Sequence, residues 1–262
     1  MPIVPQIAQR SLATGLSLNT VQWSSPLTHS GTPLVLVHGL ASNARLWDGP
    51  ARALAALGHP VIAIDQRGHG HGKGGIWDNP HWGPNYAQDD VPVKDQKEIT
   101  GHAVRAMYLY TGAADVAAAK NAVGYMNAMK TVWEDVVYRN MYVTGGIGSS
   151  GSNEGFSVDF DLPNENAYSE TCASVGMVFW NQRMNALEGD SKYIDVLERS
   201  LYNAALDGLS LEGNRFFYGN PLASSGQHYR RDWFGTACCP SNISRLVASV
   251  GDYIYAKSAD AI

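Results

Sequence analysis

The spacing of apolar residues changes between the first 70 residues and the rest of the chain. Two apolar runs of four residues, 34–37 and 61–64, flank a stretch at 46–57 where apolar residues recur at helical spacing. Strands that alternate with a helix are typical of a parallel sheet. The pattern therefore predicts a small β–α–β unit near the N-terminus.

Helical periodicity dominates from residue 95 onward. A Gly-, Pro- and Trp-rich stretch at 72–86 precedes it, which indicates three regions, 1–71, 72–94 and 95–262. Short links between helices predict antiparallel pairs, as in a bundle or an α/α toroid. A short strand is expected at 215–218. The expected helices cover 98–110, 113–138, 173–187, 192–209 and 241–256, with breaks at Gly112, Gly189 and Gly213 and a cap at Asp190.

Composition and charge argue against several classes of partner. Hydrophobic residues make up 45% of the chain and charged residues 16%, with a net charge of -5 and no run of Lys or Arg. These values disfavour nucleic acid and anionic membrane surfaces as partners. No apolar run approaches the roughly 20 residues that span a bilayer, and residues 1–22 lack the pattern of a signal peptide. We therefore expect a globular, cytoplasmic protein with no membrane partner.

The cysteines are candidates for chemistry. Their count of three argues against a disulfide framework, and Glu170 and Cys172 are separated by one residue while Cys238 and Cys239 are adjacent. Three thiolates and a carboxylate would complete a tetrahedral zinc site. Residues i and i+2 point about 200° apart on a regular helix, so Glu170 and Cys172 require extended backbone or a helix start. Three buried structural thiols remain the alternative interpretation.

Part of the first region resembles the α/β-hydrolase superfamily. The strand that ends in His38-Gly39-Leu40, the helix that contains Trp47 and the turn 65–70 carry this resemblance, over residues 15–71. A nucleophile elbow of the form G-x-S-x-G is absent from the sequence, so an esterase of this type is incomplete here.

Residues 79–256 resemble glycoside hydrolase family 127, the β-L-arabinofuranosidases. The resemblance rests on six stretches in order, which are 101–106 (GHAVRA), 144–148 (TGGIG), 154–156 (EGF), 167–172 (AYSETC), 198–203 (ERSLYN) and 237–242 (ACCPSN). It implies a mainly α fold, here a partial (α/α)6 toroid, preceded by the small β–α–β fragment. It also implies a Zn²⁺ ion held by one Glu and three Cys.

The resemblance assigns a role to each candidate. It implies Cys238 as the nucleophile and Glu154 as the general acid/base, with Glu170, Cys172, Cys238 and Cys239 as the metal ligands. The mechanism would be a retaining double displacement with a thiolate in place of the usual carboxylate. The three sulfurs are expected within roughly 4 Å of one another, because zinc–sulfur bonds are about 2.3 Å long. Glu154 is expected roughly 5 Å from Cys238, by analogy with paired carboxylates.

Other polar and aromatic residues are candidates for sugar contact. His102 and His228 are candidate substrate-binding residues, although a core position is an equal alternative for His102. Trp180 and Trp233 are suited either to stacking on a furanose or to the core. Asp90 stands where the family pattern suggests a histidine.

Three functions therefore stay open, and whether the chain is an active enzyme is one of the open points. The first is release of β-L-arabinofuranose from an arabinofuranoside-containing glycan, impaired by truncation. The second is an esterase of the α/β-hydrolase type, and the third a non-catalytic chimeric remnant. A toroid with fewer helices than the family's leaves apolar faces uncovered, which favours a homo-oligomer.

Overall fold

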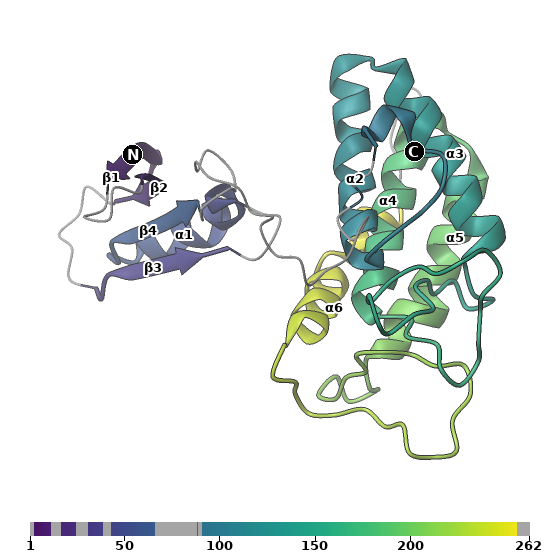
Figure 1. Cartoon of the computed structure of the whole chain (residues 1–262). Coiled ribbons are helices and arrows are strands. Elements are labelled where there is room, and N and C mark those ends of the chain that lie inside the picture. Colours follow the sequence, from purple (N-terminus) through teal and green to yellow (C-terminus); the bar gives the residue numbers. More distant parts are fainter. Residues whose placement is uncertain are drawn as a thin grey trace. The chain divides into compact units, whose positions relative to one another are not determined.

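The computed structural model describes residues 3–11, 17–24, 31–38, 43–65, 88 and 91–255 of the chain. The chain divides into two compact units, Met1–His81 and Trp82–Ile262. Figure 1 shows the sheet of the first unit and the helices of the second. The turn 66–70, Asp90 and most of the junction 72–94 lie outside the described residues.

The N-terminal unit contains a four-stranded mixed sheet. Its order is β1-β2-β4-β3, from strands β1 (Gln6–Ser11), β2 (Ser17–Trp23), β3 (Leu34–Val37) and β4 (Val61–Asp65). Strands β3 and β4 are parallel and joined through helix α1 (Asp48–Ala56), which confirms the predicted β–α–β unit. The antiparallel strands β1 and β2 were not predicted.

One face of this sheet packs against α1. Val21 and Trp23 from β2 and Val61 and Ala63 from β4 are buried there with small residues of the helix. Alternate residues of a strand point to opposite faces, and on the other face Val35 and Val37 are exposed. The buried Asp65 at the end of β4 accepts hydrogen bonds from Asn19 Nδ2 and from the backbone N–H of Ala44, each at 2.7 Å.

The C-terminal unit is mainly helical, as predicted. Its longer helices are α2 (Ala103–Lys120), α3 (Val123–Arg139), α4 (Thr171–Glu188), α5 (Ser191–Ser200) and α6 (Cys238–Ala248). Single turns at Val93–Asp95, Leu201–Ala205, Leu206–Gly208 and Val250–Tyr253 complete the regular structure of the described residues. The closed ring of an (α/α)6 toroid stays a prediction.

Several predicted boundaries were wrong. Helix α2 begins at Ala103 rather than at 98, runs through Gly112 and ends at Lys120, and Asn121 caps it with a φ of 49°. It continues through Gly112 because Tyr110, Ala113 and Ala117 keep the same face buried. A glycine inside a helix costs only about 1 kcal/mol, which this packing offsets.

The later boundaries also moved. Helix α6 begins at Cys238, three residues before the predicted start at 241, and ends at Ala248. The segment expected as a helix over 192–209 changes to a π-helical turn at Leu201. The predicted strand 215–218 is present only as isolated bridges, one of which pairs Phe216 with Arg231. Asp190 caps α5 as predicted, by accepting a hydrogen bond from the Lys192 N–H.

Helix α4 is the centre of the unit. All residues from Thr171 to Asn181 are buried, which is typical of a helix packed on every side. Figure 1 shows it among the other long helices. Trp180 packs on Tyr110 of α2 with ring centroids 5.2 Å apart, and Asn181 accepts a hydrogen bond from the Trp133 indole of α3 at 2.7 Å. These contacts hold α4, whose first turn carries Cys172, against α2 and α3.

Candidate functional site

The beginnings of two helices bring four candidate ligands together. Glu170 immediately precedes α4 and Cys172 lies in its first turn, while Cys238 and Cys239 open α6. One ligand atom from each of the four lies within 4.8 Å of all the others. Residues up to 69 positions apart in the sequence therefore meet at one point, as expected for a shared metal ion.

The two adjacent cysteines both face Glu170. The Cys238 and Cys239 sulfurs are 3.8 Å apart and lie 3.6 and 3.4 Å from Glu170 Oε1. The extended backbone of Glu170, with ψ of 136°, turns its side chain toward the sulfurs before the helix begins. This is the extended conformation that the one-residue spacing to Cys172 required.

Glu170 is buried without a complete set of hydrogen bonds. Glu170 is only 2% exposed, and its Oε2 has no hydrogen-bond partner in the described part of the chain. Burial raises the pKa of Glu170 to about 8, and the nearby Cys238 charge adds to this. An ionised carboxylate is costly in such a place unless a positive charge compensates it. The orphaned oxygen beside three thiols therefore fits a bound cation, and the donor set suits zinc.

The three thiols share their protons unequally. Hydrogen bonds from Cys172 and then from Cys239 lower the pKa of Cys238. The pKa of Cys172 is raised mainly by its bond to Cys238, and that of Cys239 mainly by its bond to Cys172. Negative charge therefore settles on Cys238, which is also the least buried of the three. A half-buried thiolate is the reactive form of cysteine.

Tyr218 is a part of this site that the sequence did not indicate. Its hydroxyl lies 3.1 Å from the Cys238 sulfur, and burial raises its pKa, so the phenol keeps its proton and donates to the thiolate. The ring is held by Phe234, with centroids 5.6 Å apart. The only available signal was its place at the end of the expected strand 215–218, and aromatic residues there are ordinary sheet formers.

Glu154 is positioned by its backbone. Its φ is 52°, and its carbonyl accepts a hydrogen bond from the Ala103 N–H that opens α2, at 3.1 Å. The next residue must be glycine, because a Cβ at Gly155 would lie 1.9 Å from the Gly101 carbonyl oxygen. The Glu154 side chain remains 41% exposed and so is accessible to a substrate.

His102 connects Glu154 to helix α2. Its Nδ1 accepts the Val104 N–H at 3.2 Å as the cap of the helix, so in the neutral ring the hydrogen is on Nε2. Nε2 then donates to Glu154 Oε2 at 3.1 Å. Burial lowers the pKa of His102, which keeps the ring neutral. A ligand atom of Glu170 also lies within 4.8 Å of this pair. Because Nε2 is a donor, the cysteine cluster suits a cation better than the His102 group does.

With this geometry established, comparison with protein families identifies the chain. The family model described as β-L-arabinofuranosidase, GH127 catalytic domain, matches residues 44–252. The chain belongs to this GH127 family. The match begins at residue 44, within the N-terminal unit, and therefore reaches further back than the resemblance seen at 79–256.

Individual relatives agree with this membership. A non-reducing end β-L-arabinofuranosidase of Bifidobacterium longum is 45% identical over 185 residues, which are 66% of this chain and 28% of that protein. The structure of a GH127 β-L-arabinofuranosidase from Geobacillus stearothermophilus matches at a TM-score of 0.66 and 47% identity, over 70% of this chain and 31% of that one. A GH127 β-arabinofuranosidase structure matches at 0.64 and 50% identity, over 65% and 27%. This chain thus spans less than a third of each.

The remaining candidates of this GH127 chain are not among the four converging groups. His228 is exposed, its Nε2 lies 2.9 Å from the Gly219 carbonyl, and its ring stacks on Phe217 with centroids 4.5 Å apart. His228 therefore contacts the two residues that flank Tyr218, but it is not one of the four converging groups. Trp180 is fully buried and Trp233 is 61% exposed.

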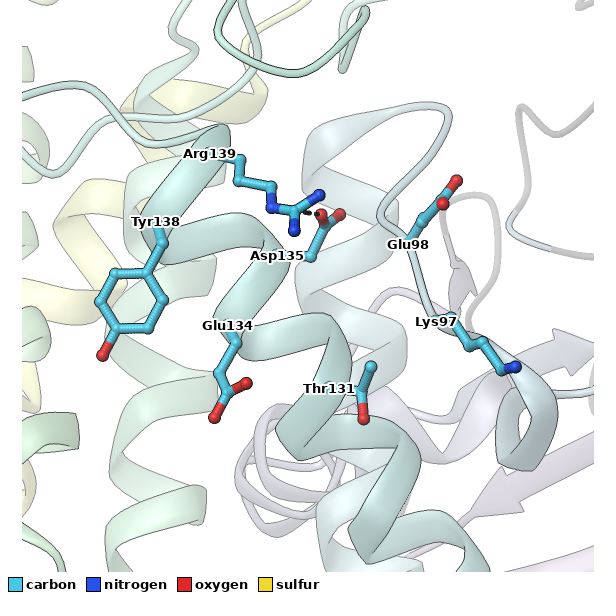
Figure 2. Close-up of a pocket in the computed structure, with 7 residues that line it drawn as sticks. All are labelled: Lys97, Glu98, Thr131, Glu134, Asp135, Tyr138 and Arg139. Atoms are coloured by element: carbon cyan, nitrogen blue, oxygen red, sulfur yellow. Dashed lines mark ion pairs between the residues drawn. The ribbon is translucent and has the colours of Figure 1, made fainter.

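A separate pocket of about 370 Å³ lies along helix α3 (Figure 2). Within it Asp135 accepts a hydrogen bond from the Ile99 N–H at 2.7 Å and lies 3.9 Å from Arg139, and burial raises the pKa of Asp135. The pocket offers no thiolate or imidazole for catalysis, since its lining residues are Lys97, Glu98, Thr131, Glu134, Asp135, Tyr138 and Arg139.

Proposed function

We propose that this chain carries the active site of a zinc-dependent retaining glycosidase for β-L-arabinofuranosides. The convergence of Glu170, Cys172, Cys238 and Cys239 around an orphaned buried carboxylate oxygen is the observation that carries the proposal. Membership of the GH127 family supports glycoside hydrolysis as the reaction. The names of its relatives support a terminal β-L-arabinofuranose in a glycan as the substrate.

The metal ligands would be the same four residues. Zn²⁺ bound there supplies positive charge that keeps the thiols ionised and compensates the Glu170 carboxylate. Two features of the protein favour this occupant over Mg²⁺ or Ca²⁺, namely the three sulfur donors and the burial of the site. Hard cations take oxygen ligands instead.

Cys238 and Glu154 would perform the two steps of the reaction. In the first, the Cys238 sulfur attacks the anomeric carbon, the glycosidic C–O bond breaks, and protonated Glu154 gives its proton to the leaving oxygen. In the second, Glu154 takes a proton from water, the water oxygen attacks the anomeric carbon, and the C–S bond breaks. Two displacements at one carbon retain its configuration.

Neighbouring side chains would hold these two groups. The Tyr218 hydroxyl at 3.1 Å orients the Cys238 sulfur, and the His102 Nε2–H at 3.1 Å orients the Glu154 carboxylate. A sugar hydroxyl is a further proposed partner of His102 and of His228, as the family resemblance implies. The cytoplasmic location and a homo-oligomer stay predictions. Among the described residues, none of the helices combines the length and the apolar composition of a membrane span.

The N-terminal unit carries the second candidate, an α/β-hydrolase origin. The parallel β3–α1–β4 crossover supports that origin for residues 15–71. An esterase activity has less support, because the sequence contains no nucleophile elbow. A non-catalytic remnant is the third possibility, and it is distinguished by experiment.

Turnover of two substrates by the zinc-loaded chain tests the proposal. We expect an aryl β-L-arabinofuranoside to be cleaved and an aryl acetate to remain intact. Cys238→Ala should lower glycoside turnover by at least about a thousandfold, since the proposed covalent intermediate forms on its sulfur. Tyr202→Ala, on an exposed side chain of the Leu201–Ala205 turn, is the matched control and should leave turnover unchanged.

Each other outcome overturns the proposal in a specific way. Ester cleavage without glycoside cleavage would establish the esterase. A chain that binds zinc and cleaves neither substrate would establish the non-catalytic remnant.

A further inference from the structure

Helices α4 and α6, which carry the three cysteines, run side by side in the same direction. In their first turns, the ligand atoms of Cys172 and Cys238 lie within 4.8 Å of each other. Seven residues further along each helix, the Arg245 guanidinium of α6 lies 4.9 Å from the centroid of the Phe179 ring of α4. Seven residues are about two turns, or roughly 10 Å of helix. The two helices are therefore in contact at the cysteines and again two turns away.

One face of each helix connects these two points of contact. Positions i, i+4 and i+7 share a face of an α-helix. Such a stripe begins at a cysteine on each of α4 and α6, and the two stripes are Cys172–Gly176–Phe179 and Cys238–Asn242–Arg245. Because each turn of a helix is hydrogen-bonded to the next, the placement of Asn242 and Arg245 also sets that of Cys238.

Tyr108 of helix α2 joins the second point of contact. Its hydroxyl donates to Asn242 Oδ1 at 2.8 Å and accepts a hydrogen bond from Arg245 Nη2 at 2.6 Å. Arg245 Nη2 also lies 2.6 Å from Asn242 Oδ1. The Tyr108 ring packs edge-on against Phe179, with centroids 5.9 Å apart. Tyr108, Asn242 and Arg245, here called the clamp, therefore tie α6 to both α2 and α4.

Tyr108 is a fixed point for this clamp. A Cβ at Gly176 of α4 would lie 2.6 Å from the Cβ of Met107, too close for two carbon atoms, so α2 and α4 touch beside Tyr108. Met107 is fully buried in that contact. Burial also raises the pKa of Tyr108 to about 12, so the phenol keeps the proton that it donates to Asn242.

Apolar packing alone does not specify where α6 lies along α4. Ile243 and Leu246 bury the other side of α6 in the core that also contains Val175 and Val178 of α4. Hydrophobic burial is non-directional, so it holds the helix against the unit without fixing its position along the groove. Hydrogen bonds depend steeply on distance and angle, so the clamp can fix that position.

We propose that Tyr108, Asn242 and Arg245 are positioning residues of the metal site. They set the place of α6 against α4 and so bring the Cys238 and Cys239 sulfurs to Glu170 and Cys172 at the spacing that a tetrahedral ion requires. This inference rests on the proposed function, since it concerns the same metal, and it adds residues that act through helix α6 rather than as ligands.

Metal binding by variants of the full chain tests the clamp. Arg245→Ala should weaken Zn²⁺ binding about tenfold, and Tyr108→Phe, which keeps the ring and removes the hydroxyl, about threefold. Competition with a chromophoric chelator measures both. The matched control is Arg183→Ala, because Arg183 forms an ion pair with Asp115 at 3.0 Å that joins α2 to α4 without involving α6. It should leave zinc affinity unchanged.

The absorption spectrum of the Co²⁺-loaded chain separates positioning from general stability. Co²⁺ accepts the same sulfur and carboxylate ligands, and its visible bands report the geometry of the ligands around it. At saturating Co²⁺ these bands should shift in Arg245→Ala and Tyr108→Phe and match the wild-type bands in Arg183→Ala. A merely structural role would change the affinity without changing the spectrum of the saturated site.

The outcomes separate the clamp from the proposed function. Wild-type affinity and spectrum in both clamp variants, a wild-type spectrum with weaker affinity, or an equal loss in Arg183→Ala would each overturn the clamp alone. A wild-type chain that binds neither metal would overturn the zinc-dependent function together with it. If circular dichroism shows that Arg245→Ala disturbs the fold, Tyr108→Phe decides, because it keeps the ring that packs against Phe179.

Discussion

The two units each contain a carboxylate that is 2% exposed, but the hydrogen-bond partners of the two carboxylates differ. Asp65 of the N-terminal unit accepts short hydrogen bonds from Asn19 and from the Ala44 backbone. Glu170 of the C-terminal unit faces two sulfurs through Oε1 and has no partner for Oε2 in the described residues. A buried charge is tolerated only where something compensates it.

The difference separates a structural carboxylate from a functional one. The fold itself supplies the donors that Asp65 requires, so that this residue stabilises its own unit. Glu170 receives only the weak S–H donors of thiols on Oε1 and has no partner on Oε2 in the described residues, and we propose that a bound cation compensates it. Burial alone therefore does not distinguish the two; the inventory of hydrogen-bond partners does.

Zinc binding by a matched pair of amide variants is the strongest test of this comparison. Glu170→Gln should weaken zinc binding by more than about a hundredfold, because it removes the anionic oxygen ligand. Asp65→Asn makes the same chemical change in the other unit and should leave zinc affinity unchanged. Competition with a chromophoric chelator measures both.

Equal zinc affinity of the two variants would contradict the comparison. Loss of zinc from both would mean that the units depend on each other for folding, which near-ultraviolet circular dichroism would reveal.

The stability of the N-terminal unit should depend on Asp65 and not on Glu170. Asp65→Ala leaves the Ala44 N–H and the Asn19 amide buried without their acceptor, at a cost of about 2–4 kcal/mol. Hydrogen exchange of the amides in β2 and β4 would report the change for this unit by itself. Protection equal to that of the wild-type chain would show that Asp65 does not hold the sheet together.

An exposed carboxylate that accepts a hydrogen bond should contribute less to the free energy of unfolding than the buried Asp65. Asp190 is exposed and caps α5 by accepting the Lys192 N–H at 3.0 Å. Asp190→Ala should lower the free energy of unfolding of the C-terminal unit by about 1 kcal/mol, and Asp190→Asn should retain most of it. Urea denaturation of the three proteins checks this order, and a loss in the Asn variant equal to that in the Ala variant would exclude capping as the cause.

The smallest expected effect is a pH dependence of stability at Asp135. This carboxylate has fewer hydrogen-bond donors than Asp65 and is more buried than Asp190. Its pKa is raised by burial, although it accepts one hydrogen bond from Ile99. A raised pKa means that its contribution to stability is fully present below the ordinary Asp value of about 3.9 and is lost as pH rises through the folded-state pKa. Melting temperatures of the wild-type chain relative to Asp135→Asn should therefore fall from acidic to neutral pH. If the melting temperature of the wild-type chain instead rises relative to that of Asp135→Asn as pH increases, the pKa of Asp135 is lowered rather than raised.

The parts of the fold that sequence predicted are those in which periodicity and burial agree. The β3–α1–β4 crossover and the helical C-terminal unit were predicted because their apolar residues face the core at regular spacing. Strand β1 was missed because all six of its residues are exposed, so no alternation marks it. The helix break was placed at Gly112 instead of Asn121, because local propensity is overridden by packing along α2.

The site divides in the same way. Glu170, Cys172, Cys238 and Cys239 could be proposed because thiols and carboxylates are zinc donors and the family resemblance favours a metal over buried structural thiols. Tyr218 could not, because a tyrosine is common in strands and only its distance from Cys238 shows its role. The link from His102 to Glu154 depends on a loop that folds back on α2, which no spacing rule describes.

The positive φ of Glu154 has a consequence for protein engineering. Left-handed backbone is comfortable for glycine and asparagine and unfavourable for a glutamate, by about 1 kcal/mol. A library screened for heat resistance alone would therefore enrich Gly or Asn at position 154 and discard the carboxylate. Directed evolution of this chain would therefore need a selection on turnover at every round, because the most stable variants would lack the acid/base that we propose.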